Sequence, residues 1–222
     1  MNLDFSPVLA GWEPLLRGTL VTIEVTAGAL LLSCCVGLLI GIGRLNPERK
    51  FIYMLCSTYL TIFRGTPLLV QLFIWFFGLP QFGILLPAYM CGVLGLGMYS
   101  ASYVSEVVRG SIQSVDKGQG EAARSLGMSA RQAMRKIILP QALVRMIPPL
   151  GNEFIALIKN SALVSLLTIH DVMHEGQKII SVSYRSLETY LVIALIYLVL
   201  TATAMFILRK VENSLKAGGM VQ

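Results

Sequence analysis

Charged residues are scarce in this chain of 222 residues, and their scarcity excludes whole classes of protein. Only 14% of the residues are charged, 55% are hydrophobic, and the mean hydropathy is +0.70. A typical soluble domain has about 25% charged residues, so we expect this chain to lie in a membrane. The motif G-x-x-x-x-G-K-[ST] is also missing, which indicates that the chain does not cradle nucleotide phosphates by itself.

Cysteine and histidine, the usual ligands of transition metals, are equally sparse. The cysteines lie within or beside apolar runs at spacings that match no zinc or redox site, and we interpret them as small hydrophobic residues. They are Cys34, Cys35, Cys56 and Cys91. The only histidines, His170 and His174, stand four residues apart, as two metal ligands on one helix face would. We favour the alternative that Asp171 caps a helix there, and we expect no metal site.

Two further patterns suggest functions that their context excludes. Gly118-x-Gly120-x-x-Ala123 has the letters of a dinucleotide fingerprint, but no strand precedes it and no βαβ unit fits around it. The net charge of +6 could suggest nucleic-acid binding. The basic residues are instead spread over loops between apolar runs, so we expect no nucleic-acid partner.

Long apolar runs predict the membrane topology. A span needs about 20 apolar residues, and five stretches qualify: residues 20–43, 53–77, 85–108, 145–168 and 190–208. Lysine and arginine cluster after the first, third and fifth of these, whereas the other side holds only Arg17, Lys178 and Arg185. The positive-inside rule then places the N-terminus outside and the C-terminus in the cytoplasm.

The segment before the first span has apolar residues at helical spacing. They predict that residues 1–18 include a short amphipathic helix, from Phe5 to Leu16, on the outer membrane face. The segment has no basic region followed by a short apolar stretch and a cleavage site, so we do not expect a removed signal peptide.

The loop between the third and fourth spans, residues 110–143, is polar and basic and has ordered local signals. Asp116 can cap a helix that Gly127 ends in left-handed geometry. Ser129 and Gln132 form the two halves of a capping box for a second helix, which Pro140 is expected to close. Small residues in the first helix would let another surface approach closely, so the sequence predicts a docking loop.

The loop resembles the cytoplasmic loop of permease subunits of binding-protein-dependent ABC importers. The resemblance rests on the pattern EAA, three residues, G, nine residues, I-x-L-P, which is complete at Glu121, Ala122, Ala123, Gly127, Ile137, Leu139 and Pro140. The stretches 63–67, 152–155 and 159–161 are similar to the polar amino-acid uptake subfamily, the cystine-, glutamine- and histidine-type permeases. Ala162 departs from that subfamily, which more often has a hydroxyl residue there.

This resemblance implies an all-α integral membrane protein with the type I ABC importer permease fold and a cytoplasmic coupling helix. Residues 19–210 would form the transmembrane domain and residues 211–222 a cytoplasmic tail. The chain would be a transporter subunit and not an enzyme, without a cofactor of its own, since ATP and Mg²⁺ would bind a separate ATP-binding cassette subunit. An extracytoplasmic amino-acid-binding protein and a second permease copy, identical or paralogous, would complete the machine in the bacterial inner membrane.

Polar residues at membrane depth predict a translocation path, because such residues usually face a bundle interior or a watery cavity. The candidates are Gln71, Tyr99, Ser102, Asn152, Glu153, Lys159 and Asn160. The alternative is that Glu153 and Lys159 pair with each other and serve only packing. For Glu106 and Arg109 we favour a structural role, as anchors at the cytoplasmic interface.

The second span is interrupted at Arg64-Gly65-Thr66-Pro67. Because Thr66 precedes a proline, the sequence predicts a break in the helix around Gly65 and Pro67. The break could serve as a hinge or as a static kink, and the sequence leaves both open.

Two rival functions remain. An ion-coupled secondary carrier would act alone, but the second half of an inverted repeat is missing and the docking loop would have no purpose. A membrane scaffold without substrate would leave the polar residues of the fourth span unexplained.

Overall fold

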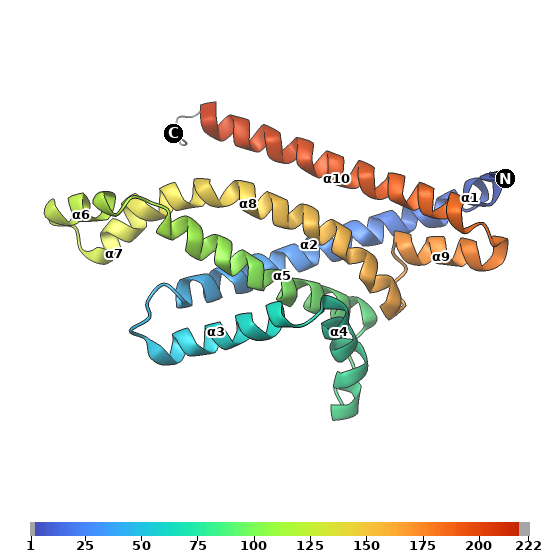
Figure 1. Cartoon of the computed structure of the whole chain (residues 1–222), viewed down its shortest axis with the longest axis horizontal. Helices are drawn as coiled ribbons and strands as arrows, with labels where there is room; N and C mark the ends of the chain where they lie inside the picture. Colours follow the sequence, from blue (N-terminus) through green and yellow to red (C-terminus); the bar gives the residue numbers. More distant parts are fainter. Residues whose placement is uncertain (1–2, 218–222) are drawn as a thin grey trace.

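The computed structural model describes residues 3–217, and these fold into helices without any strand. The predicted all-α class is therefore confirmed for the described part of the chain (Figure 1). Several short π or 3-10 turns, labelled η, interrupt the α-helices. The elements are α1 (Ser6–Ala10), α2 (Trp12–Gly43), α3 (Lys50–Gly65), α4 (Leu68–Phe73), η1 (Ile74–Gly78), η2 (Leu79–Phe82), α5 (Ala88–Gln113), α6 (Lys117–Ser125), α7 (Ala130–Ala133), η3 (Met134–Ile138), α8 (Leu139–Asn160), η4 (Ser161–Leu167), α9 (Val172–Ser183) and α10 (Ser186–Ala217).

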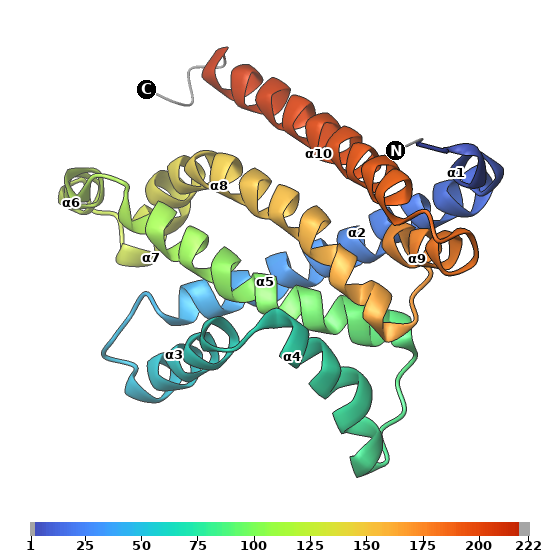
Figure 2. The same cartoon turned by 45° about the vertical axis from the view of Figure 1, so that its right-hand side comes forward.

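Helix α5 lies at the centre of the bundle, between α2, α8 and the bent pair α3 and α4 (Figure 2). Its tightest partner is α2, because glycines let the two backbones approach closely. A Cβ added at Gly37 would lie 2.6 Å from the Val104 side chain, and one added at Gly97 would lie 2.7 Å from Leu32. Around this seam, Val25, Ala29, Leu96 and their neighbours form the main apolar core.

Within residues 3–217, three helical segments are long and apolar enough to cross a membrane: Trp12–Gly43, Ala130–Leu167 and Ser186–Leu215. A fourth span is obtained if the pair Lys50–Gly65 and Leu68–Phe82 counts as one, although its two parts meet at an angle of 105°. The predicted break in the second span is therefore confirmed. Figure 2 shows α4 turning away from α3 and pointing out of the bundle.

Two predicted boundaries are wrong. The N-terminal segment is not one surface helix, because the chain breaks at Gly11 between α1 and α2, and Trp12 to Leu16 belong to the long α2. Pro140 does not close the second helix of the docking loop. It lies in the first turn of α8, and the helical segment runs from Ala130 to Leu167, so the fourth span begins before Arg145. Residues 218–222 of the predicted tail lie outside the described residues, and residues 211–217 continue α10.

The short helix α9 begins as predicted. Asp171 is its N-cap, and the side chain accepts a hydrogen bond from the backbone N–H of His174 at 2.9 Å. The rings of His170 and His174 lie 4.7 Å apart. Among residues 3–217, no third histidine, cysteine or carboxylate joins them in a group that could hold a metal ion.

Candidate functional site: a docking loop and a buried polar cluster

The docking loop begins with a well-capped helix. The Asp116 side chain accepts a hydrogen bond from the Gly118 N–H at 2.7 Å, which starts α6 as predicted. Gly127 has φ +84, the left-handed geometry that glycine adopts at low cost. Its N–H donates to the Arg124 carbonyl at 2.9 Å, and the chain turns there toward α7. The predicted glycine elbow is confirmed.

The second half of the loop is continuous with a membrane span. The capping box of α7 is complete, because the Ser129 N–H donates to Gln132 at 2.8 Å and the Gln132 N–H donates to the Ser129 hydroxyl at 3.3 Å. From α7 the chain runs without a break through η3 into α8. The loop is therefore joined to α8 by continuous helix, in which Pro148 and Pro149 interrupt the hydrogen bonds before Glu153.

The residues of the EAA pattern do not all face outward. Glu121 and Ala122 are exposed, whereas Ala123 is 5% exposed and packs against the loop itself. Ile137 and Leu139 are half-buried, and Pro140 is exposed. Leu126, which sequence reasoning missed, is 82% exposed beside the elbow. Its position next to Gly127 could have indicated this, because the helix ends there and the Leu126 side chain projects outward.

The loop is tied to the end of α5. Arg145 of α8 donates to the Ser114 hydroxyl at 3.1 Å and also to the Ser114 carbonyl. Beneath this contact, Val108 and Ile112 of α5 pack with Ala142 and Met146 of α8. The loop therefore has a fixed geometry relative to the bundle.

A second candidate site is a polar cluster formed by three helices. Glu153 of α8 accepts a hydrogen bond from the Ser100 hydroxyl of α5 at 2.8 Å. On the same helix α5, the hydroxyls of Tyr99 and Tyr103 lie 3.0 Å apart. The Arg64 guanidinium, at the end of α3, lies 4.8 Å from the centre of the Tyr103 ring and interacts electrostatically with Glu153. These five residues are called the polar cluster below.

The other predicted path residues are dispersed. Gln71 is buried and donates to the Phe63 carbonyl at 2.9 Å and to the Thr66 hydroxyl at 2.8 Å, so it holds the break between α3 and α4. Ser102 is fully buried and donates to a carbonyl of its own helix. The remaining three lie on α8 or at its end, two of them exposed and the last half-buried: Asn152, Lys159 and Asn160.

Within residues 3–217 Glu153 and Lys159 do not pair, because Glu153 accepts from Ser100 and no ion pair of Lys159 occurs there. Three members of the polar cluster were missed: Arg64, Ser100 and Tyr103. Arg64 stood beside the predicted break. A charged residue next to a break in a membrane helix was a signal that could have found it. Nothing in the local sequence indicated that Ser100 would meet Glu153.

Glu106 has the structural setting that we expected. Its carboxylate accepts from Arg109 at 2.6 Å and also pairs with Arg44, the residue that follows α2. The Arg44 guanidinium in turn lies 5.8 Å from the Tyr53 ring of α3. This network joins α2, α3 and α5 at one end of the bundle.

Comparisons with known proteins identify the family to which the chain is similar. Residues 33–217 match the family described as "Binding-protein-dependent transport system inner membrane component". The chain is 36% identical to the arginine transport system permease protein ArtQ of Bacillus subtilis strain 168, over 98% of this chain and 99% of that one. It is 37% identical to the putative glutamine transport system permease protein GlnP of Rickettsia bellii strain RML369-C, over 96% of each.

A solved structure is similar over the same extent. The crystal structure of an amino acid ABC transporter with histidines has a chain that is 41% identical, with a TM-score of 0.91, over 96% of this chain and 100% of that one. The family predicted from the loop is therefore confirmed. The chain belongs to the inner membrane components of binding-protein-dependent transport systems.

Proposed function

We propose that this permease carries a polar amino acid, and that the polar cluster is part of its path. The observation that carries the proposal is the meeting of Arg64, Glu153 and two tyrosines from three helices. An amino acid has a carboxylate that suits a guanidinium and an ammonium that suits a carboxylate. Relatives with 36% to 37% identity carry names for arginine and glutamine transport, which supports this substrate class.

Asn152, Lys159 and Asn160 would extend the path along α8. Asn152 and Lys159 are exposed, and neither side chain has a hydrogen-bond partner within residues 3–217. Because polar groups facing hydrocarbon are costly, a water-filled path or a second permease copy would cover them. This supports a pair of permeases, identical or paralogous, with the path at their interface.

The docking loop would bind the separate subunit that hydrolyses ATP. Glu121, Ala122 and Leu126 offer an exposed surface that combines charge, close approach and apolar area. Since η3 and α8 continue from the loop to Glu153, closure of the ATPase subunits would tilt α8 and move the polar cluster. The break at Gly65 and Pro67 would act as a hinge. It would let α4 either move with α8 or keep its position while α8 tilts. Access would then alternate around a fixed site.

Topology completes the proposal. Five spans would be formed by α2, the bent pair of α3 and α4, α5, α8 and α10, in the bacterial inner membrane. The N-terminus would lie outside, where a substrate-binding protein delivers the amino acid, and the docking loop would lie in the cytoplasm. This arrangement is supported by the basic residues that cluster around α6 and in the last turns of α10.

The test is uptake by the permease reconstituted with its ATPase subunit and binding protein, with a panel of radiolabelled amino acids as competitors. Glu153→Gln keeps the hydrogen bond to Ser100 but removes the charge, and we expect it to lower uptake about tenfold or more. The matched control is Glu48→Gln, an exposed loop residue, with unchanged uptake expected. Wild-type uptake by Glu153→Gln would contradict the proposed path.

The same preparation distinguishes the rival carrier. Reconstituted permease without the ATPase subunit should accumulate no substrate under an ion gradient. Accumulation without ATP would instead favour an ion-coupled secondary carrier, and unimpaired uptake in cells that lack the permease would favour a scaffold.

A further inference from the structure

The end of the bundle opposite the docking loop carries the marks of a membrane surface. α1, α9 and the first turns of α2 and α10 gather there (Figure 1). Trp12 is 59% exposed at the start of α2, and Tyr184 and Tyr190 are exposed near the start of α10. Aromatic residues with a polar edge concentrate where lipid headgroups meet hydrocarbon. This end therefore lies at headgroup level.

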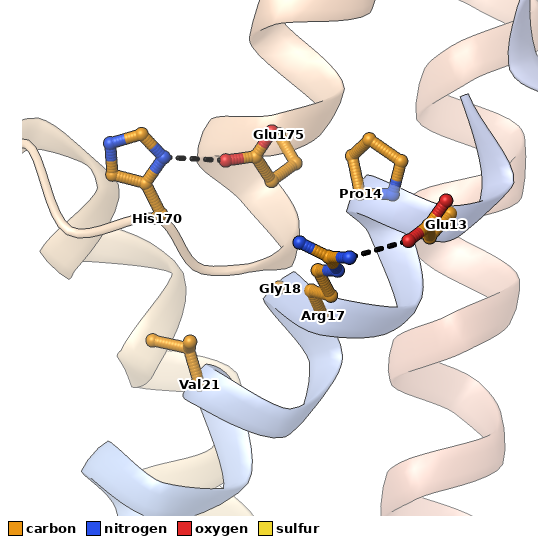
Figure 3. Close-up of a pocket in the computed structure, with 7 residues that line it drawn as sticks. All are labelled: Glu13, Pro14, Arg17, Gly18, Val21, His170 and Glu175. Atoms are coloured by element: carbon orange, nitrogen blue, oxygen red, sulfur yellow. Dashed lines mark hydrogen bonds and ion pairs between the residues drawn. The ribbon is translucent and has the colours of Figure 1, made fainter.

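A charged cavity of about 480 Å³ opens at this level, between α2 and the start of α9 (Figure 3). On one wall Arg17 pairs with Glu13 at 2.5 Å. On the facing wall Glu175 accepts from His170 at 2.7 Å and from Lys178 at 3.1 Å. These partners hold the pKa of Glu175 below its usual value against the opposing effect of burial.

Arg17 is the most accessible charged side chain of this cavity, and Glu175 is the least accessible. The Glu175 side chain is 10% exposed and is covered by its own partners. The Arg17 side chain is 77% exposed, and only one of its terminal nitrogens is used by Glu13. Arg17 thus retains donors that face the cavity, as Figure 3 shows.

An apolar cleft of about 500 Å³ adjoins the charged cavity. The two share Pro14 and Glu175 as lining residues, so they form one continuous site. The cleft lies between α1 and α9, and its walls are formed by Pro7, Ala10, Ile179 and Val182, with Lys178 at the boundary. A charged compartment joined to an apolar one at headgroup level matches the two halves of an amphiphile.

We propose that this site binds a zwitterionic phospholipid. Its phosphate would accept hydrogen bonds from Arg17 and Lys178, and its ammonium would approach Glu13. The glycerol and the first part of an acyl chain would lie in the cleft along Val182. Formal charges favour a zwitterion over an anionic lipid, since Glu13 and Glu175 balance Arg17 and Lys178 when His170 is neutral.

The test measures lipid retention directly. The permease complex with its ATPase subunit is purified in detergent, and dioleoyl phosphatidylethanolamine or dioleoyl phosphatidylglycerol is titrated while native mass spectrometry counts the bound lipids. We expect the double variant Arg17→Gln/Lys178→Gln to weaken retention of the ethanolamine lipid at least about tenfold, because two charge-assisted hydrogen bonds are lost. Val182→Asp, which changes an exposed residue of the cleft, should weaken it as well.

Arg185→Gln is the matched control. Arg185 lies at the same end but contacts Glu188 at 3.6 Å and lines neither compartment, so retention should stay at the wild-type level. Single Arg17→Gln removes an exposed side chain and keeps the test valid if the double variant does not fold. Equal retention of the ethanolamine lipid by all variants would overturn the proposal. It would also be overturned if phosphatidylglycerol bound as well as the ethanolamine lipid and its binding depended on Arg17.

Loss of stimulation by the binding protein, with lipid retention unchanged in the Arg17 variants, would assign the cavity to that partner and also overturn the proposal. Uptake is measured separately, so failure of lipid binding is distinguishable from failure of the proposed transport function.

Discussion

The docking loop and the polar cluster are built in opposite ways. In the loop, Asp116, Gly127 and the pair Ser129 and Gln132 each contact residues only two or three positions away. In the polar cluster, Ser100 and Glu153 are separated by 53 residues, and the third helix enters through Arg64. The loop is therefore specified by local chemistry, whereas the cluster exists only when three helices are packed.

The difference assigns separate tasks to the two regions. A locally specified loop keeps its shape when a partner pulls on it, which suits a point where force is applied. A cluster that depends on packing changes when a helix tilts, which suits a site whose access must alternate. Helix α8 joins the two, because it continues from η3 and carries Glu153.

The largest effect is expected from breaking this connection. Lys136→Pro places a proline inside η3, where the lost N–H and the ring clash cost about 3 kcal/mol. ATP hydrolysis should continue, but its stimulation by substrate-loaded binding protein should be lost. The measurement is the ratio of stimulated to basal ATPase activity of the reconstituted complex.

Lys117→Pro provides the matched control, because Lys117 is the first residue of α6 and proline is tolerated there. It should retain the stimulation. If both variants or neither lost it, continuity between the loop and α8 would not be what couples the two regions.

This contrast also explains how much the sequence could predict. The caps, the elbow at Gly127 and the break after Gly65 were all predicted correctly, because each is a property of a few consecutive residues. The role of Pro140 was predicted wrongly. A proline suits the first turn of a helix as well as the residue after its end, and only the continuity of η3 with α8 distinguishes them.

The polar cluster could be predicted only in part. Glu153 and Tyr99 stood out as polar residues in apolar runs, but the Ser100 partner of Glu153 did not, since pairing depends on which helices meet. Gln71 was predicted to line the path, but its amide holds the α3–α4 break through residues five and eight positions away. The five-span topology and its orientation stay predictions.

A smaller effect concerns Asp171, a local cap in a buried setting. Burial raises the pKa of its carboxyl from 3.8 to about 6. The unfolded chain releases this proton first, so the group stabilises the folded state below about pH 4, and that contribution is lost as the pH rises through about 6. The shift corresponds to at most about 3 kcal/mol.

Asp171→Asn keeps a good cap but cannot titrate. We expect the thermal unfolding temperature of the wild-type complex to fall, relative to this variant, between about pH 4 and pH 6. Asp116→Asn, which changes the exposed cap of α6, should follow the wild-type profile. Parallel profiles for the wild type and Asp171→Asn would show that burial of Asp171 has no energetic consequence.

The smallest expected effect on stability tests the docking surface itself. Ala122 and Ala123 are adjacent, but the first is exposed and the second is 5% exposed because it packs against the loop. With exposed Cys35 replaced by serine, Ala122→Cys should react readily with a maleimide and crosslink to the ATPase subunit in native membranes. Ala123→Cys should react about tenfold more slowly and crosslink poorly, since its thiol becomes accessible only when the loop opens. Equal crosslinking at both positions would mean that the partner unfolds the loop on binding, and the helical connection from docking surface to polar cluster would then fail.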